Sequence, residues 1–232
     1  MMKKTVLGIK IDDITSDEAI ELVRIWLTAK KKRFIATPNP EFIVAAQKDE
    51  EFLNILNNAD LSLPDGVGLK LAGVKNIVHG ADFLEKLVEK TPDWKISIGF
   101  LGGEPGIAEK AAKYLKVKYP NIKLSFAASG GFVDNTGNMH TPYLIPYTDL
   151  LFVGIAYPKA EKWIYKNLDK LPVKVAMGVG GAFDFISGKV PRAPKFVQNL
   201  RLEWLFRLII QPWRIKRQIA LLKYLVLLLT SK

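Results

Sequence analysis

Apolar and polar positions repeat along the chain with two periods, which predict strands and helices in turn. Near-continuous apolar runs such as "KISIGFLGG" and "DLLFVGIAYPK" are typical of strands buried on both faces of a sheet. Stretches such as "DEAIELVRIWLTAKKK", "PEFIVAAQKDEEFLNILNNA" and "AEKWIYKNLDKL" each predict one helix, because their apolar residues recur at helical spacing. The alternation predicts an α/β fold: a doubly wound, mostly parallel, Rossmann-like sheet with helices on both faces.

The two ends of the chain differ from this pattern. The run "TVLGIKI" predicts a first strand, and no apolar stretch of signal-peptide length precedes it, so we expect a cytoplasmic protein. Beyond Pro194, Arg, Trp and Leu dominate the composition. We therefore expect an α/β core over residues 1–195 and a basic, amphipathic helical tail over residues 196–232, which Pro212 breaks into two helices.

Open α/β sheets bind their ligands beyond the carboxyl ends of the strands. Glycine at such an end lets the backbone approach a ligand closely, although a glycine there is as often an ordinary turn residue. The rule selects six segments of this chain: Thr37–Pro40, Pro64–Gly66, Gly102–Gly106, Ser129–Gly131, Gly154–Lys159 and Gly178–Asp184.

Composition narrows the chemistry of a site at this edge. The net charge of +11 favours a polyanionic partner, either nucleic acid, an anionic membrane or a phosphorylated substrate. The chain has no cysteine, which excludes disulfides, a thiolate nucleophile and Cys-ligated metals, and its two histidines disfavour a histidine-based metal site. No P-loop, GxGxxG fingerprint or GxSxG elbow is present, so we expect neither a metal nor a cofactor.

Asp65 is the main acidic candidate, because it follows a predicted strand in "LPDGVG". It is either an ordinary Asp-Gly turn residue or a general base. Thr37 and Asn39 in "ATPNP" lie near it if their strands are neighbours. Asp184 in "GGAFDF" either contacts a nucleotide or caps the next turn.

These loops, in this order, resemble one family, the bacterial WecG/TagA/CpsF glycosyltransferases. The resemblance covers nearly the whole chain and is most specific at its end. It is carried by "TPNPEFIVAAQKDEEFLNILNNADLSLPDGVGL", "GADFLEKL", "FLGGEPGIAEKAAKYLKVKYP", "LLFVGIAYPKAEKWI" and "VGGAFDFISGKVPRAPKFVQNLRLEWLFRLIIQPWRIKRQ".

The resemblance implies an inverting, metal-independent hexosyltransferase. Such enzymes move an N-acetylated hexosamine, here N-acetylmannosamine, from a UDP-sugar to a polyprenyl-diphosphate-linked N-acetylglucosamine in wall teichoic acid synthesis. Asp65 stands at the position of the base, and Thr37 and Asn39 at positions lining the sugar pocket. We expect Gly102, Gly103, Gly154, Lys159, Gly180 and Asp184 to bind the donor.

The chain departs from the family pattern at three positions. Ile77 stands where members carry an arginine, for which Lys75 or His79 is a candidate substitute. Ala160 replaces a pocket glutamine in "PKAE", and Ala156 replaces a glycine. These losses bear on the donor sugar and keep an alternative open, a non-catalytic nucleotide-sugar or phospholipid-binding protein that recruits a glycan-assembly complex.

The tail combines cationic and apolar side chains, a pattern typical of helices that bind a membrane surface. We expect it to dock on the anionic inner face of the cell membrane, where lipid-linked acceptors lie, and to bring Arg207, Arg214 and Arg217 to a diphosphate. The alternatives are packing against the core and a homo-oligomer contact. The longest apolar run, "IALLKYLVLLL", is too short for a membrane span, and aliphatic rather than base-stacking neighbours disfavour nucleic acid.

Overall fold

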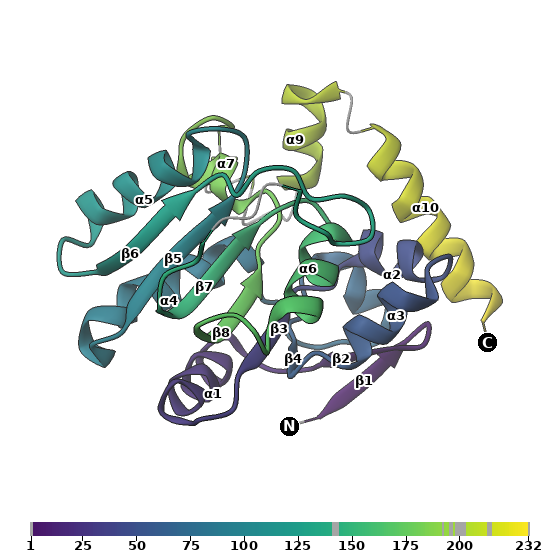
Figure 1. The fold of residues 1–232 in the computed structure, drawn as a ribbon. Coiled ribbons are helices and arrows are strands. Elements are labelled where there is room, and N and C mark those ends of the chain that lie inside the picture. Colours follow the sequence, from purple (N-terminus) through teal and green to yellow (C-terminus); the bar gives the residue numbers. More distant parts are fainter. Residues whose placement is uncertain are drawn as a thin grey trace.

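A six-stranded parallel sheet forms the centre of the molecule, in the order β4-β3-β8-β7-β5-β6 (Figure 1). The computed structural model describes residues 2–140, 144–191, 193–194, 197, 203–212 and 215–231. The predicted Rossmann-like α/β fold is confirmed. The strands are β3 (Arg33–Ala36), β4 (Leu61–Ser62), β5 (Ser97–Gly102), β6 (Lys123–Ala128), β7 (Thr148–Gly154) and β8 (Val173–Gly178).

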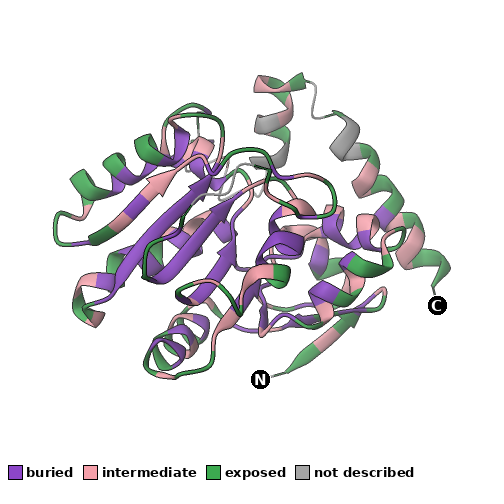
Figure 2. Ribbon diagram, viewed as in Figure 1, coloured by how far each residue is buried: buried purple, intermediate pink, exposed green. Residues whose placement is uncertain are grey.

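Helices cover both faces of this sheet, and each layer has its own hydrophobic core. Every residue of β5 and β7 is buried, as their continuous apolar runs predict (Figure 2). One core takes in α1 (Ser16–Thr28), α4 (Gly80–Trp94), α5 (Ile107–Lys118) and α7 (Ala182–Ile186). The other takes in α2 (Pro40–Ala46), α3 (Glu50–Asn57), α6 (Lys159–Asn167) and α10 (Ile215–Thr230).

Two predicted elements are wrong in detail. The single strand expected in "TVLGIKI" is an antiparallel hairpin outside the main sheet, β1 (Lys3–Val6) and β2 (Ile9–Asp12). Leu7 and Gly8 turn the chain, both with positive φ, as two-residue hairpin turns require. The helix expected over residues 40–59 is two helices, because the carboxylate of Asp49 accepts the backbone N–H of Phe52 and caps a new start.

The predicted break of the tail at Pro212 is confirmed, since α9 (Glu203–Ile210) ends before it and α10 begins after it. α10 lies along α2 (Figure 1), and Tyr224 on its inner face is fully buried. Between β4 and α4 runs a short 3-10 helix, η1 (Val67–Ala72). A Cβ added at Gly68 in η1 would lie 2.7 Å from Pro40 and 3.5 Å from Leu221, so η1 contacts both α2 and α10.

Candidate active site

At the carboxyl ends of the central strands, the chain continues to one face of the sheet after one strand and to the other face after its neighbour. The helices that follow β3 and β7, α2 and α6, pack in one core, whereas those that follow β8 and β5, α7 and α5, pack in the other. Along the order β3-β8-β7-β5 the segments therefore diverge at every step. Such divergence is where α/β sheets bind ligands, so this edge is the candidate active site.

Two of the predicted site residues, Thr37 and Asp65, meet at the start of α4. The backbone N–H of Asp65 donates to the carbonyl oxygen of Pro38 at 3.1 Å, which joins the loops after β3 and β4. A Cβ added at Gly80, the first residue of α4, would lie 3.3 Å from Thr37 Cγ2 and 3.5 Å from Asp65 Oδ2. The proximity expected from neighbouring strands is therefore present.

The polar atoms of Thr37 and Asn39 are partly used by the fold itself. Thr37 is buried, and its hydroxyl donates to the carbonyl oxygen of Gly178 at 3.3 Å. Asn39 is the N-cap of α2, where its Oδ1 accepts the backbone N–H of Phe42 at 3.0 Å. The amide nitrogen is therefore the group that Asn39 can offer to a ligand.

A histidine and a helix N-terminus lie beside the carboxylate of Asp65. His79 Nδ1 lies 3.4 Å from Asp65 Oδ1, and the other carboxylate oxygen lies beside the positive N-terminal end of the α4 dipole. The Asp65 side chain keeps 28% of its surface exposed, so an incoming hydroxyl group can reach it.

His79 is the candidate substitute that reaches the site. The backbone N–H of Lys75 donates to the carboxylate of Asp13 at 3.1 Å, and Lys75 is exposed. Ile77, where the resemblance implies an arginine, packs partly buried against the core. The contact between His79 and Asp65 was not predicted from the sequence; its signal was a histidine directly before the helix start "GADF".

Packing accounts for Gly102 and Gly154, two of the four glycines expected to bind the donor. Gly102 and Gly154 are paired in register on β5 and β7, and a Cβ added at Gly154 would lie 2.3 Å from the Phe183 ring. The N–H of Gly103 donates to the carbonyl oxygen of Gly154 at 2.8 Å. Gly180, whose φ is also positive at +48°, differs because nothing lies within 4 Å of an added Cβ.

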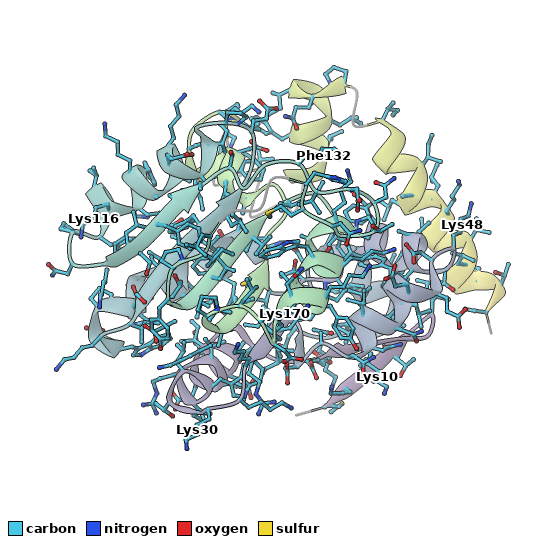
Figure 3. The ribbon with its side chains drawn as sticks, viewed as in Figure 1. Lys10, Lys30, Lys48, Lys116, Phe132 and Lys170 are labelled. Carbon is cyan, nitrogen blue, oxygen red and sulfur yellow. The ribbon has the colours of Figure 1, made fainter. Side chains whose placement is uncertain are left out.

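The other predicted donor contacts lie on the β7 and β5 side of this edge. Lys159 begins α6, and its ammonium lies 4.9 Å from the ring centroid of Phe132, an exposed residue of the β6–β7 loop (Figure 3). Asp184 Oδ1 lies 3.7 Å from Lys189 Nζ, and Lys189 also pairs with Glu104 at 2.7 Å. Asp184 thus sits beside the loop after β5.

The sequence pattern did not indicate the buried carboxyl group of Glu161. Glu161 follows Ala160 in "PKAE", is 1% exposed and lies against Gly178 at the end of β8. Burial raises the pKa of Glu161 to about 7. Ala160 itself is fully buried. The motif "PKAE" could be recognised from the sequence, but the burial of Glu161 could not, because it depends on Gly178, seventeen residues further on.

The tail arginines fall outside the detailed description. Arg214 lies outside the described residues, as do the side chains of Arg207 and Arg217, whose backbones belong to α9 and α10. Within the described ranges, no three His, Cys, Asp or Glu side chains gather as metal ligands. None of the helices described is both long enough and apolar enough to cross a bilayer.

Comparisons with known proteins identify relatives of this chain. A sequence model described as "Glycosyl transferase WecG/TagA/CpsF family" matches residues 4–232. A Bacillus subtilis (strain 168) protein named N-acetylglucosaminyldiphosphoundecaprenol N-acetyl-beta-D-mannosaminyltransferase is 31% identical over 217 residues, covering 91% of this chain and 84% of the relative. Proteins of the same name from Bacillus spizizenii (31% over 225 residues; 94% and 87% covered) and Staphylococcus aureus MRSA252 (28% over 224 residues; 93% and 87% covered) are also similar.

Proposed function

The chain belongs to the WecG/TagA/CpsF family of glycosyl transferases, and on that premise we propose that it moves N-acetylmannosamine from a UDP-sugar to a polyprenyl-diphosphate-linked N-acetylglucosamine. The relatives named above carry this acceptor and this sugar in their names. The product belongs to the assembly of a cell-wall polymer of the wall teichoic acid type. The reaction inverts the anomeric carbon and needs no metal ion.

The meeting of Thr37 and Asp65 at the start of α4 is the observation that carries this proposal. Asp65 takes the proton of the acceptor hydroxyl while the hydroxyl oxygen attacks the anomeric carbon of the donor. The bond from that carbon to the UDP oxygen breaks on the opposite face, and its electron pair leaves with UDP. The Thr37 hydroxyl and the Asn39 amide hold the donor sugar for this attack.

The donor lies across four neighbouring strands in this proposal. Asp65, Thr37, Gly180 and Lys159 follow β4, β3, β8 and β7, which are adjacent in the sheet. Strands lie about 4.8 Å apart, so this edge spans about 14 Å, which suits an extended nucleotide sugar. The open backbone at Gly180, the ammonium of Lys159 and the tail arginines stabilise the charge that develops on the leaving diphosphate.

The tail brings this site to the bilayer in the same proposal. The outer face of α10 exposes apolar side chains every three or four residues, at Ile215, Ile219, Leu222, Val226 and Leu229. Its inner face packs on α2, and Leu221 lies close to η1, which begins two residues after Asp65. Docking of the apolar face on an anionic membrane therefore places the acceptor end of the site at the membrane surface.

Release of UDP is the test. Wild type and Asp65→Asn are incubated with UDP-sugars of several hexosamines and a polyprenyl-diphosphate-linked N-acetylglucosamine. We expect release with UDP-N-acetylmannosamine and a loss of about 10²–10⁴-fold in Asp65→Asn. Asp93→Asn, the same charge change at the far, exposed end of α4, is the control. Binding of UDP by wild type without release from any donor would favour the non-catalytic alternative.

A further inference from the structure

Glu161 is a buried acid at a position where burial is not required. It is the third residue of α6, and Glu109 is the third residue of α5. Both helices follow a central strand of the sheet, yet Glu109 is exposed and Glu161 is 1% exposed. The helix start alone does not account for this difference, because an acid in a first turn is equally stabilised at the surface.

The end of β8 is shaped to accept this carboxyl group. Glu161 Oε1 lies so close to Gly178 that an added Cβ would be 2.6 Å away, a distance that real side chains do not adopt. A side chain at the last residue of β8 would therefore displace the buried carboxyl group. The two residues form a fitted contact between α6 and the sheet.

Among the described residues, the surroundings of Glu161 offer it no countercharge. Its Oε2 is buried without a hydrogen-bond partner in the described part of the chain. The charged groups on the elements around it are engaged elsewhere, Lys162 with Asp49 and Glu51, Lys159 with the Phe132 ring, Lys174 with Asp149, and Arg33 with Asp60. A carboxyl group in such a place is accommodated in its uncharged form.

Two contacts connect this group to the proposed base. The carbonyl oxygen of Gly178 accepts the hydroxyl of Thr37 at 3.3 Å. The methyl group of Thr37 and Asp65 Oδ2 both lie beside Gly80, 3.3 Å and 3.5 Å from a Cβ added there. A displacement of Gly178 therefore moves Thr37 relative to Asp65.

We propose that Glu161 is a positioning residue for sugar transfer: its uncharged carboxyl group, packed beneath Gly178, holds the end of β8 where Thr37 faces Asp65. The proposal rests on the function proposed above. Glu161 touches neither substrate nor reacting atom; it acts through Gly178 and Thr37. When Glu161 ionises, the charge draws water or a cation into the contact, Gly178 shifts, and transfer slows.

The pH dependence of transfer tests the proposal. We expect kcat/KM of wild type to fall about tenfold for each pH unit above the titration of Glu161, between pH 6 and 9. Glu161→Gln, which has the same shape and cannot ionise, keeps at least half of the wild-type kcat/KM at pH 6 and lacks the alkaline fall. Glu109→Gln, the matched exposed position, follows wild type. Each profile is repeated in a His79→Gln background, because histidines also change charge near neutral pH.

Backbone amide NMR signals of Thr37 and Gly178 give a second readout that needs no activity. In wild type they shift with the same midpoint as kcat/KM, and in Glu161→Gln they do not. If Glu161→Gln fails to fold, Glu161→Met supplies the same uncharged bulk. The proposal would be overturned if kcat/KM of the folded variant still falls at alkaline pH. It would also be overturned if the amide signals of Thr37 and Gly178 in wild type do not shift over the pH range in which kcat/KM falls. An inactive wild type whose amides still titrate would overturn the proposed function and support the link from Glu161 to Thr37.

Discussion

The free energy of unfolding should depend on pH through Glu161, and the structure sets the sign and the size. In the unfolded chain a glutamate titrates near 4.5, whereas burial raises the pKa of Glu161 to about 7 in the folded protein. Below pH 4.5 both states hold the proton. Between pH 4.5 and 7 the unfolded state releases it and the folded state keeps it, so stability falls as pH rises. At about 1.4 kcal/mol per pH unit, the loss reaches about 3 kcal/mol by pH 8.

Urea unfolding followed by tryptophan fluorescence measures this loss, because the chain has five tryptophans. Wild type, Glu161→Gln and the exposed control Glu109→Gln are each unfolded at pH 4.5 and pH 8. The stability of Glu161→Gln relative to wild type should rise by about 3 kcal/mol between these pH values, while that of Glu109→Gln stays constant. Taking the difference between variants cancels the other titrating groups. Equal pH dependence in wild type and Glu161→Gln would refute the reasoning.

Three further outcomes are expected. Tyr224→Phe should raise the free energy of unfolding by about 1 kcal/mol in urea titrations, because the Tyr224 hydroxyl is buried with no partner among the described residues. Gly154→Ala should lower it by about 2 kcal/mol or more, because its Cβ would lie 2.3 Å from the Phe183 ring. Val226→Glu, on the exposed face of α10, should weaken sedimentation with vesicles of anionic phospholipid at least tenfold and leave stability unchanged.

Each of these has a matched comparison within the chain. A destabilised Tyr224→Phe would mean that the hydroxyl has a partner beyond the described residues. Gly180→Ala, where an added Cβ meets open space, should cost only about 1 kcal/mol from its positive φ, so a cost equal to that of Gly154→Ala would contradict the packing argument. Val226→Gln separates loss of apolar contact from charge repulsion, and unchanged vesicle binding in both variants would exclude α10 as the docking face.

The sheet could be predicted because its central strands are continuous apolar runs, a signal that needs no knowledge of their neighbours. The strand ends predict where the candidate site lies, and the adjacency of β3 and β4 explains why Thr37 and Asp65 both lie beside Gly80. Chain reversals were harder. The hairpin depends on positive φ at Leu7, a residue that rarely adopts it, and so carried no turn signal there.

The contacts of Glu161 and His79 could not be predicted from local pattern. Glu161 in "KAE" and Glu109 in "IAE" occupy the same helical position, and only the fit of Gly178 against the first makes it buried. His79 is relevant to the candidate site because it contacts Asp65, which lies in a loop fourteen residues earlier in the chain. Both depend on which strands and loops become neighbours, which is decided by the whole fold.

The contact of α10 with η1 makes the tail part of the architecture as well as a proposed anchor. Leu221 and Tyr224 cover apolar surface on α2 and beside Gly68, so a chain cut at Pro194 loses a wall of its own core together with any membrane contact. A protein truncated at Pro194 would then lose activity because its core is incomplete, whether or not membrane binding matters. Substitutions confined to the exposed positions, such as Leu222 or Val226, preserve the packing of α10 on the core and therefore change membrane binding alone.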